Sequence, residues 1–354
     1  MSRSQKLKVP PSSKLPEFLF GREMSTPVRL AYGLAPMIQF LENTGHAVEP
    51  LLAATEIPRF ALEEPSYRIS LEQKLKFTRL VLARVKSASA ALEIGRRFHL
   101  SMFSVLGLTA SCAPTIRDSL QLLLTYPELA WGLIELVVWR EGEHKYIAFE
   151  PGPVVRELGP FFVERDSIAI LNLFRNLVGT HLVAHAVAFR HRAPKDSRLY
   201  DAFFGCPVEF GAKINEMSFE SRVWDTPPLQ ANAMSRRFFE NQCRRLSEMM
   251  QEPFKFSDIV RSRLRSATPI PALPMLARAL HMTARTLQRR LALETTDFSS
   301  VLREVRIQRA TELMHRSHLH LEEVAYRLGF HDPDAFSRAF RTWTGLSPTE
   351  FRRR

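Results

Sequence analysis

Cysteine is scarce in this sequence: the 354 residues contain only Cys112, Cys206 and Cys243. Their number is odd and no two are closely spaced, which argues against a disulfide framework and against a zinc ribbon. Gly-rich phosphate loops, the nucleophile motif of hydrolases and CxxC motifs are also missing. We therefore expect no catalytic residue, no metal site and no cofactor, and a protein of the reducing cytoplasm.

Long apolar runs are missing too. No stretch of the sequence stays apolar for the length that spans a bilayer. The amino-terminal run MSRSQKLKVPPSSKLPEF contains basic, Ser and Pro residues but lacks the apolar core of a signal peptide. We expect residues 1–25 to form a flexible tail, and the protein to be neither exported nor associated with a membrane.

Positive charge is in excess and is unevenly distributed. The chain has 49 Lys and Arg against 37 Asp and Glu, a formal charge of +12. Residues 255–354 contain 18 of these cations and 10 of these anions. Such an excess indicates a polyanionic partner without identifying it. The length and the apolar share of 45% allow two domains with buried cores.

Proline marks the division between the expected domains. Four prolines between residues 251 and 274 interrupt any continuous helix, and we place the boundary near residue 255. The sequence DTPP at 225–228 precedes a segment in which Phe239, Cys243, Leu246 and Met250 recur at helical spacing. We expect a connecting helix and linker over 229–254.

The carboxyl-terminal region contains an internal repeat. Leu273, Leu276, Ala277 and Leu280 reappear 48 residues later as Leu321, Val324, Ala325 and Leu328. Both sets follow the spacing of a helix with one buried stripe, and each is followed by a break and a second short amphipathic helix. A run long enough for a helix of several turns separates the two copies. The pattern predicts an all-α domain with two helix-turn-helix units, 273–294 and 321–344, joined by a long helix.

Turn and cap residues support these helix boundaries. Thr283 and Asp332 are suited to cap the second helix of each unit, and proline follows Asp332 at the first helical position. Gly329 permits a left-handed turn between the helices of the second unit, where the first unit has His281. The sequence SPTE at 347–350 predicts a capping box that opens a short final helix.

The runs RTLQRRL, RIQRATELM and LGFHDPDAFSRAFRTWTGLSPTEFR resemble the AraC/XylS-type DNA-binding domain, over residues 255–354. The resemblance implies that the second helix of each unit reads base edges, since Arg suits guanine, Gln suits adenine and Asp accepts from cytosine. The base-reading candidates are Arg285, Gln288, Arg289, Asp334, Ala335 and Arg338. The phosphate-contact candidates are Arg306, His331, Arg341 and Arg352. The alternative is a helical module whose arginines form only a solvated face.

Residues 26–228 have a mixed pattern. We expect helices within 27–45, 69–87, 115–129 and 161–179, a hairpin over 133–151, a strand within 185–192 and two short strands within 206–220. This order predicts an α+β domain with a small sheet. The segment from Tyr200 through FFGCPVEFGAKINEMSFESRVWDTPPL resembles the arabinose-binding-type amino-terminal domain of AraC-like regulators. That resemblance implies a domain that senses a small molecule, mediates dimerisation, or does both.

These observations favour a sequence-specific transcription regulator, an activator controlled by a small-molecule effector that binds the amino-terminal domain. The partners it implies are double-stranded DNA, RNA polymerase, an unknown effector and a second copy of the chain. One alternative is a constitutive regulator whose amino-terminal domain only dimerises. Another is an enzyme that carries a DNA-binding module, which would need a reactive cysteine in a recognisable site. The spacing of residues identifies neither the effector nor its binding residues.

Overall fold

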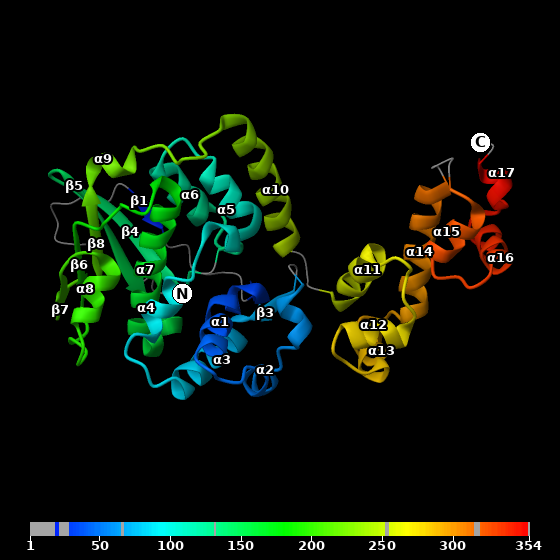
Figure 1. Ribbon diagram of the computed structural model, residues 1–354, viewed down its shortest axis with the longest axis horizontal. Helices are drawn as coiled ribbons and strands as arrows, with labels where there is room; N and C mark the ends of the chain where they lie inside the picture. The colour runs from blue at the N-terminus through cyan, green and yellow to red at the C-terminus, as the bar shows by residue number, and fades with distance from the viewer. Residues whose placement is uncertain are drawn as a thin grey trace, which may run out of the picture. The chain divides into compact units, whose positions relative to one another are not determined.

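The computed structural model describes residues 18–20, 28–64, 67–130, 132–251, 255–314 and 319–352. The chain divides into two compact units (Figure 1). Unit 1 comprises Met1–Ile57 and Arg68–Glu252, and unit 2 comprises Pro58–Tyr67 and Pro253–Arg354. None of the helices in the described part of the chain combines the length and the apolar character that crossing a membrane requires.

Unit 1 is built on a six-stranded sheet in the order β1-β4-β5-β8-β6-β7, in which only β6 and β7 are parallel neighbours. The strands are β1 Phe18–Phe20, β4 Ile134–Glu141, β5 His144–Pro151, β6 Ala186–Phe189, β7 Val208–Phe210 and β8 Glu216–Glu220. The predicted hairpin is the β4–β5 pair, and Gly142 in its turn has the positive φ of 57° that favours glycine. The predicted α+β class is confirmed.

The main core of unit 1 lies between this sheet and the long helix α7 (Gly159–Val178). Strand side chains alternate between faces, so Leu136 and Val138 of β4 enter the same buried cluster as Phe174 of α7. Val137 and Trp139 belong to a second, smaller cluster on the other face of β4. The strand is therefore buried on both faces.

Short helices and a two-stranded ribbon complete unit 1. The ribbon pairs β2 (Val28–Leu30) with β3 (Arg68–Ser70), so the helix predicted within 27–45 begins only at Ala35. The α-helices are α1 Ala35–Asn43, α2 Glu49–Ala54, α3 Leu71–Arg84, α4 Ala90–Gly95, α5 Ser104–Ser111, α6 Ile116–Thr125, α8 Arg198–Phe204 and α9 Ser221–Trp224. The 3-10 helices of unit 1 are η1 Ala31–Leu34, η3 Leu100–Phe103 and η4 Pro153–Leu158.

Two segments outside this framework differ in part from the sequence pattern. Phe18–Phe20, inside the expected tail of 1–25, forms β1 and pairs with β4, whereas 1–17 and 21–25 lie outside the described residues. The connecting helix is α10 (Ala233–Gln251), which packs along α5. Cys243 and Met250 are buried as their spacing predicts, but Leu246 is 37% exposed.

The described part of unit 2 is helical apart from its connections. Its elements are η2 Arg59–Leu62, α11 Phe256–Ser266, α12 Leu273–Ala279, α13 Ala284–Ala292, α14 Phe298–Met314, α15 Leu321–Arg327, α16 Pro333–Thr344 and α17 Pro348–Arg352. Helix α14 contacts α11, α15, α16 and α17. Figure 1 shows α12 and α13 near one end of α14 and α15 to α17 near its other end. The predicted pair of helix-turn-helix units joined by a long helix is confirmed.

Residues 58–67 belong with unit 2 although the expected domain over 26–228 includes them. Phe60 is fully buried and its ring lies 6.4 Å from the ring of Phe256. Arg263 forms an ion pair with Glu64 at 3.2 Å. These contacts join residues about 200 positions apart, so no local pattern predicts them.

Candidate nucleic-acid interface

The two helix-turn-helix units bury corresponding residues. In α12 and the turn after it, Leu276, Ala277 and Leu280 are at most 2% exposed. In α15 and its turn, Val324, Ala325 and Leu328 are at most 1% exposed. The small alanine in each set allows the second helix to pack closely against the first. The repeat in the sequence therefore corresponds to two helix-turn-helix units that bury equivalent residues.

Helix α13 has one buried and one exposed face. The Thr283 hydroxyl accepts a hydrogen bond from the amide of Thr286 at 3.1 Å, which confirms the predicted cap. Leu287 and Leu291 are fully buried against the rest of unit 2. Burial of this face leaves three predicted base-reading side chains exposed to solvent: Arg285, Gln288 and Arg289.

Helix α16 has the same arrangement with an acidic start. The Asp332 carboxylate accepts hydrogen bonds from the amides of Asp334 and Ala335 at 3.0 and 3.1 Å, which confirms this cap. Phe336 and Phe340 are fully buried. Of the residues predicted to read bases here, Asp334 and Arg338 are exposed, whereas Ala335 is half-buried.

Left-handed residues end the first helices of both helix-turn-helix units, as predicted for Gly329. His281 has a φ of 50° and Gly329 a φ of 74°, the two corresponding turns of the repeat. A Cβ on Gly329 would lie 2.3 Å from the carbonyl oxygen of Ile270, so this turn requires glycine for space as well as for its dihedral angle. Gly345, with a φ of 76°, ends α16, and Ser347 and Glu350 form the predicted capping box at the start of α17.

The four phosphate-contact candidates lie in different surroundings. His331 and Arg341 are exposed beside and on α16. Arg352 is exposed as well, and its guanidinium donates to the carbonyl of Leu319. Arg306 is half-buried and donates two hydrogen bonds to the turn after α15. The role of all four in DNA binding stays a prediction.

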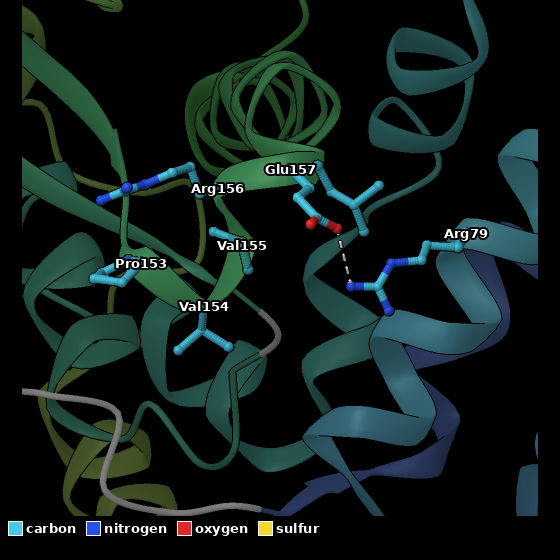
Figure 2. A pocket seen from close by; sticks show the side chains of 7 residues that line it. Arg79, Pro153, Val154, Val155, Arg156 and Glu157 are labelled. Atoms are coloured by element: carbon cyan, nitrogen blue, oxygen red, sulfur yellow. Dashed lines mark hydrogen bonds and ion pairs between the residues drawn. The ribbon is translucent and has the colours of Figure 1, made fainter.

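Unit 1 contains surface pockets that the sequence did not predict. One of about 360 Å³ lies between Arg79 of α3 and η4. Figure 2 shows Arg79 and Glu157 pointing toward each other across it, and their side chains form an ion pair at 3.5 Å. A second pocket of about 430 Å³ lies where η3 and α5 meet the end of α7 and residues 228–230. Among the described residues, no three His, Cys, Asp or Glu side chains are grouped to hold a metal ion.

Known proteins resemble both units in sequence. Residues 45–228 match the family model described as the arabinose-binding domain of AraC transcription regulator, amino-terminal, and residues 276–354 match a helix-turn-helix domain. An HTH-type transcriptional regulator of Mycobacterium tuberculosis is 26% identical over 329 residues, which cover 91% of this chain and 96% of that protein. The ornithine utilization regulator of Pseudomonas aeruginosa is 28% identical over 328 residues, 92% and 96% of the two chains.

A solved structure also aligns along most of the chain. The transcriptional regulator CdpR from Pseudomonas aeruginosa superposes with a TM-score of 0.46 at 23% identity, covering 92% of this chain and 99% of its own. The amino-terminal family model alone spans more than half of the sequence, and the carboxyl-terminal match falls on the paired helix-turn-helix units. The chain therefore belongs to the AraC family of DNA-binding transcription regulators.

Proposed function

We propose that this protein is a transcription activator that reads two successive half-sites on DNA under the control of a small-molecule effector bound in unit 1. The observation that carries the proposal is the arrangement of α13 and α16. Each helix is capped, buries one apolar face and exposes polar side chains, and both belong to units that α14 joins. Two such helices fit successive major grooves on one face of DNA when they lie about 34 Å apart.

The proposed reading residues are those whose chemistry matches base edges. Arg285 and Arg289 suit guanine, where a guanidinium donates to O6 and N7 together. Gln288 suits adenine. On α16, Arg338 supplies a guanidinium and Asp334 accepts from cytosine, while Ala335 offers only a small apolar contact. His331, Arg341 and Arg352 are proposed to neutralise phosphates, which fixes the register on the duplex without reading its sequence.

Enrichment from a random-sequence duplex library tests the DNA-reading half of the proposal. We expect the full-length protein to enrich two sequence elements whose centres lie about one helical turn, roughly 10 base pairs, apart. Mobility shifts with the enriched duplex and with a scrambled duplex of equal length then measure the preference. Equal binding to the two duplexes would mean that the arginines form only a charged, solvated face.

An effector screen tests the control by unit 1. L-Ornithine is the first compound to test, because one relative of this chain is an ornithine utilization regulator. An effector that binds only the folded state raises the melting temperature through mass action. We expect such a rise, and an effector-dependent increase of transcription by RNA polymerase from a promoter that carries the enriched sites. Transcription that no tested metabolite changes would favour the constitutive alternative.

Dimerisation is the remaining part of the proposal. Sedimentation of the full chain with and without effector distinguishes a monomer from a homodimer.

The other alternative function, an enzyme with a DNA-binding module, would need a reactive cysteine. All three cysteines are buried, and burial raises the pKa of Cys206 and Cys243, which lowers their thiolate fraction at neutral pH. This environment favours a regulator over such an enzyme.

A further inference from the structure

Arg306 lies on α14, and its guanidinium is bound to the turn of the second helix-turn-helix unit. Its Nε donates to the carbonyl oxygen of Leu328 at 3.0 Å, and one terminal nitrogen donates to the carbonyl oxygen of Gly329 at 3.0 Å. Burial lowers the pKa of Arg306, in keeping with a guanidinium shielded from water. The side chain is therefore held in one orientation by the protein itself.

These two acceptors follow the end of α15. The last carbonyl groups of a helix have no partner inside the helix and carry partial negative charge. A planar guanidinium with donors in a fixed fork can bind two neighbouring carbonyls at once, which an ammonium group cannot match in geometry. Arg306 thus joins the rod-like α14 to the turn that leads into α16.

The same side chain also contacts the aromatic core beneath α16. The guanidinium carbon of Arg306 lies 4.3 Å from the centre of the Phe330 ring. That ring lies 5.7 Å from Phe336 and 6.0 Å from Trp343, both on α16. Displacement of the Arg306 side chain would therefore change the contacts of Phe330, which packs against α16, the proposed reading helix.

A second contact holds this turn from the side of the first helix-turn-helix unit. Ile270, in the connection between α11 and α12, donates its amide hydrogen to the carbonyl of Arg327 at 3.2 Å. The carbonyl oxygen of Ile270 also lies against Gly329. The turn before α16 is consequently bound both by Arg306 of α14 and by Ile270 in the connection to α12.

We propose that Arg306 is a positioning residue, which fixes α16 relative to α13 and thereby sets the spacing between half-sites that the protein accepts. This inference rests on the proposed reading of two half-sites. It gives Arg306 a different main role from the phosphate contact that the family resemblance implies. A guanidinium whose orientation two backbone carbonyls determine acts on DNA through the helix that it supports.

The test compares full-length wild type, Arg306→Lys and Arg306→Gln on the duplex that the wild type enriches, and on a duplex with one base pair inserted between its half-sites. Lysine keeps the charge but not the two-carbonyl geometry. We expect both variants to bind the enriched duplex about tenfold more weakly, the scale of one lost charge-assisted hydrogen bond. We also expect both to discriminate less between the two spacings, with an unchanged dependence of affinity on salt.

The matched control is Arg341→Gln, which removes an exposed arginine of α16 proposed to contact phosphate. Loss of one phosphate contact lowers the slope of log K against log salt by about 0.9. If Arg306→Gln showed that loss of slope while Arg306→Lys bound like the wild type, Arg306 would be a phosphate contact and the inference would be wrong.

Hydrogen exchange of the α16 amides separates positioning from folding. We expect the α16 amides of Arg306→Lys to stay protected as in the wild type, because the fully buried Phe336 and Phe340 still pack this helix onto its unit. Complete loss of that protection would assign Arg306 to folding of the unit and overturn the inference. A wild type that enriches no duplex would contradict the proposed function itself, whereas unchanged spacing selection by Arg306→Lys would contradict only this inference.

Discussion

The guanidinium of Arg338 lies 3.8 Å from the carboxylate of Asp332, the residue that caps α16. Both side chains are more than half exposed, at 73% and 52%, so the pair adds at most about 1 kcal/mol of stability. Its effect is on orientation, because the pair draws the Arg338 side chain toward the first turn of α16. Asp332 therefore has two separable roles, capping the helix and orienting an arginine.

Substitution of Asp332 separates these roles. Asp332→Ala removes both cap hydrogen bonds, and we expect a loss of about 1 kcal/mol in the free energy of unfolding. Asp332→Asn keeps a capping oxygen but loses the ion pair, so its stability is expected to stay near that of the wild type. Chemical denaturation of the full chain, with hydrogen exchange of α16, measures both. Equal loss in the two variants would show that charge, not capping, stabilises this helix.

Two left-handed glycines of unit 2 give a matched pair. Gly345 has open space where a Cβ would lie, so Gly345→Ala is expected to cost about 1 kcal/mol for the left-handed backbone alone. In Gly329→Ala the new methyl group also meets the Ile270 carbonyl, which we expect to add about 1–3 kcal/mol. Denaturation midpoints of the two variants check the difference. Similar losses would argue against the close contact at Ile270.

Loss of a base-reading arginine and loss of a phosphate-contacting arginine are expected to affect the affinity for DNA in different ways. We expect Arg289→Ala to relax discrimination at one base pair of the first half-site by about 1–3 kcal/mol, with no change in melting temperature. Arg303→Ala removes an exposed arginine of α14 that is not a proposed DNA contact, and serves as the control. Binding titrations on duplexes with single base-pair changes measure the effect. Uniform weakening on every duplex would reassign Arg289 to phosphate contact.

Unit 1 contains a titratable group whose protonation is coupled to folding. The Nε2 atom of His191 lies 3.0 Å from the Glu164 carboxylate, to which the Tyr200 hydroxyl also donates at 2.9 Å. Burial alone lowers the pKa of His191, but hydrogen bonds to Glu164 and to the Arg192 carbonyl outweigh it, and the pKa is raised above 6.5.

A raised pKa in the folded state determines the sign of the pH effect. Folded His191 holds its proton more tightly than the unfolded chain does, so its contribution to stability is complete below pH 6.5. That contribution is lost as the pH rises through the folded pKa. We expect His191→Gln to remove this part of the pH dependence of unfolding, whereas His99→Gln, at an exposed position, keeps it. An unchanged profile in His191→Gln would contradict the coupling.

The sequence predicted those parts of the candidate interface that depend on near neighbours. The caps at Thr283 and Asp332, the left-handed turn at Gly329 and the buried stripes of α12 and α15 each involve residues within about one or two helical turns. It predicted the β4–β5 hairpin for the same reason. It did not predict the start of α1, because Val28–Leu30 pair with β3 about forty residues later.

By itself, then, the sequence determined the class of the protein: a charge-rich repeat with helical period and matched caps specifies two helix-turn-helix units, whatever surrounds them. Only the tertiary structure decided where Arg306 directs its guanidinium, which segment joins Phe256 in a core, and how six strands are ordered. Periodicity and capping arise from interactions along one helix. The other features arise when surfaces that are far apart in the chain pack against each other. The residue pattern of one surface does not specify which other surface it will pack against.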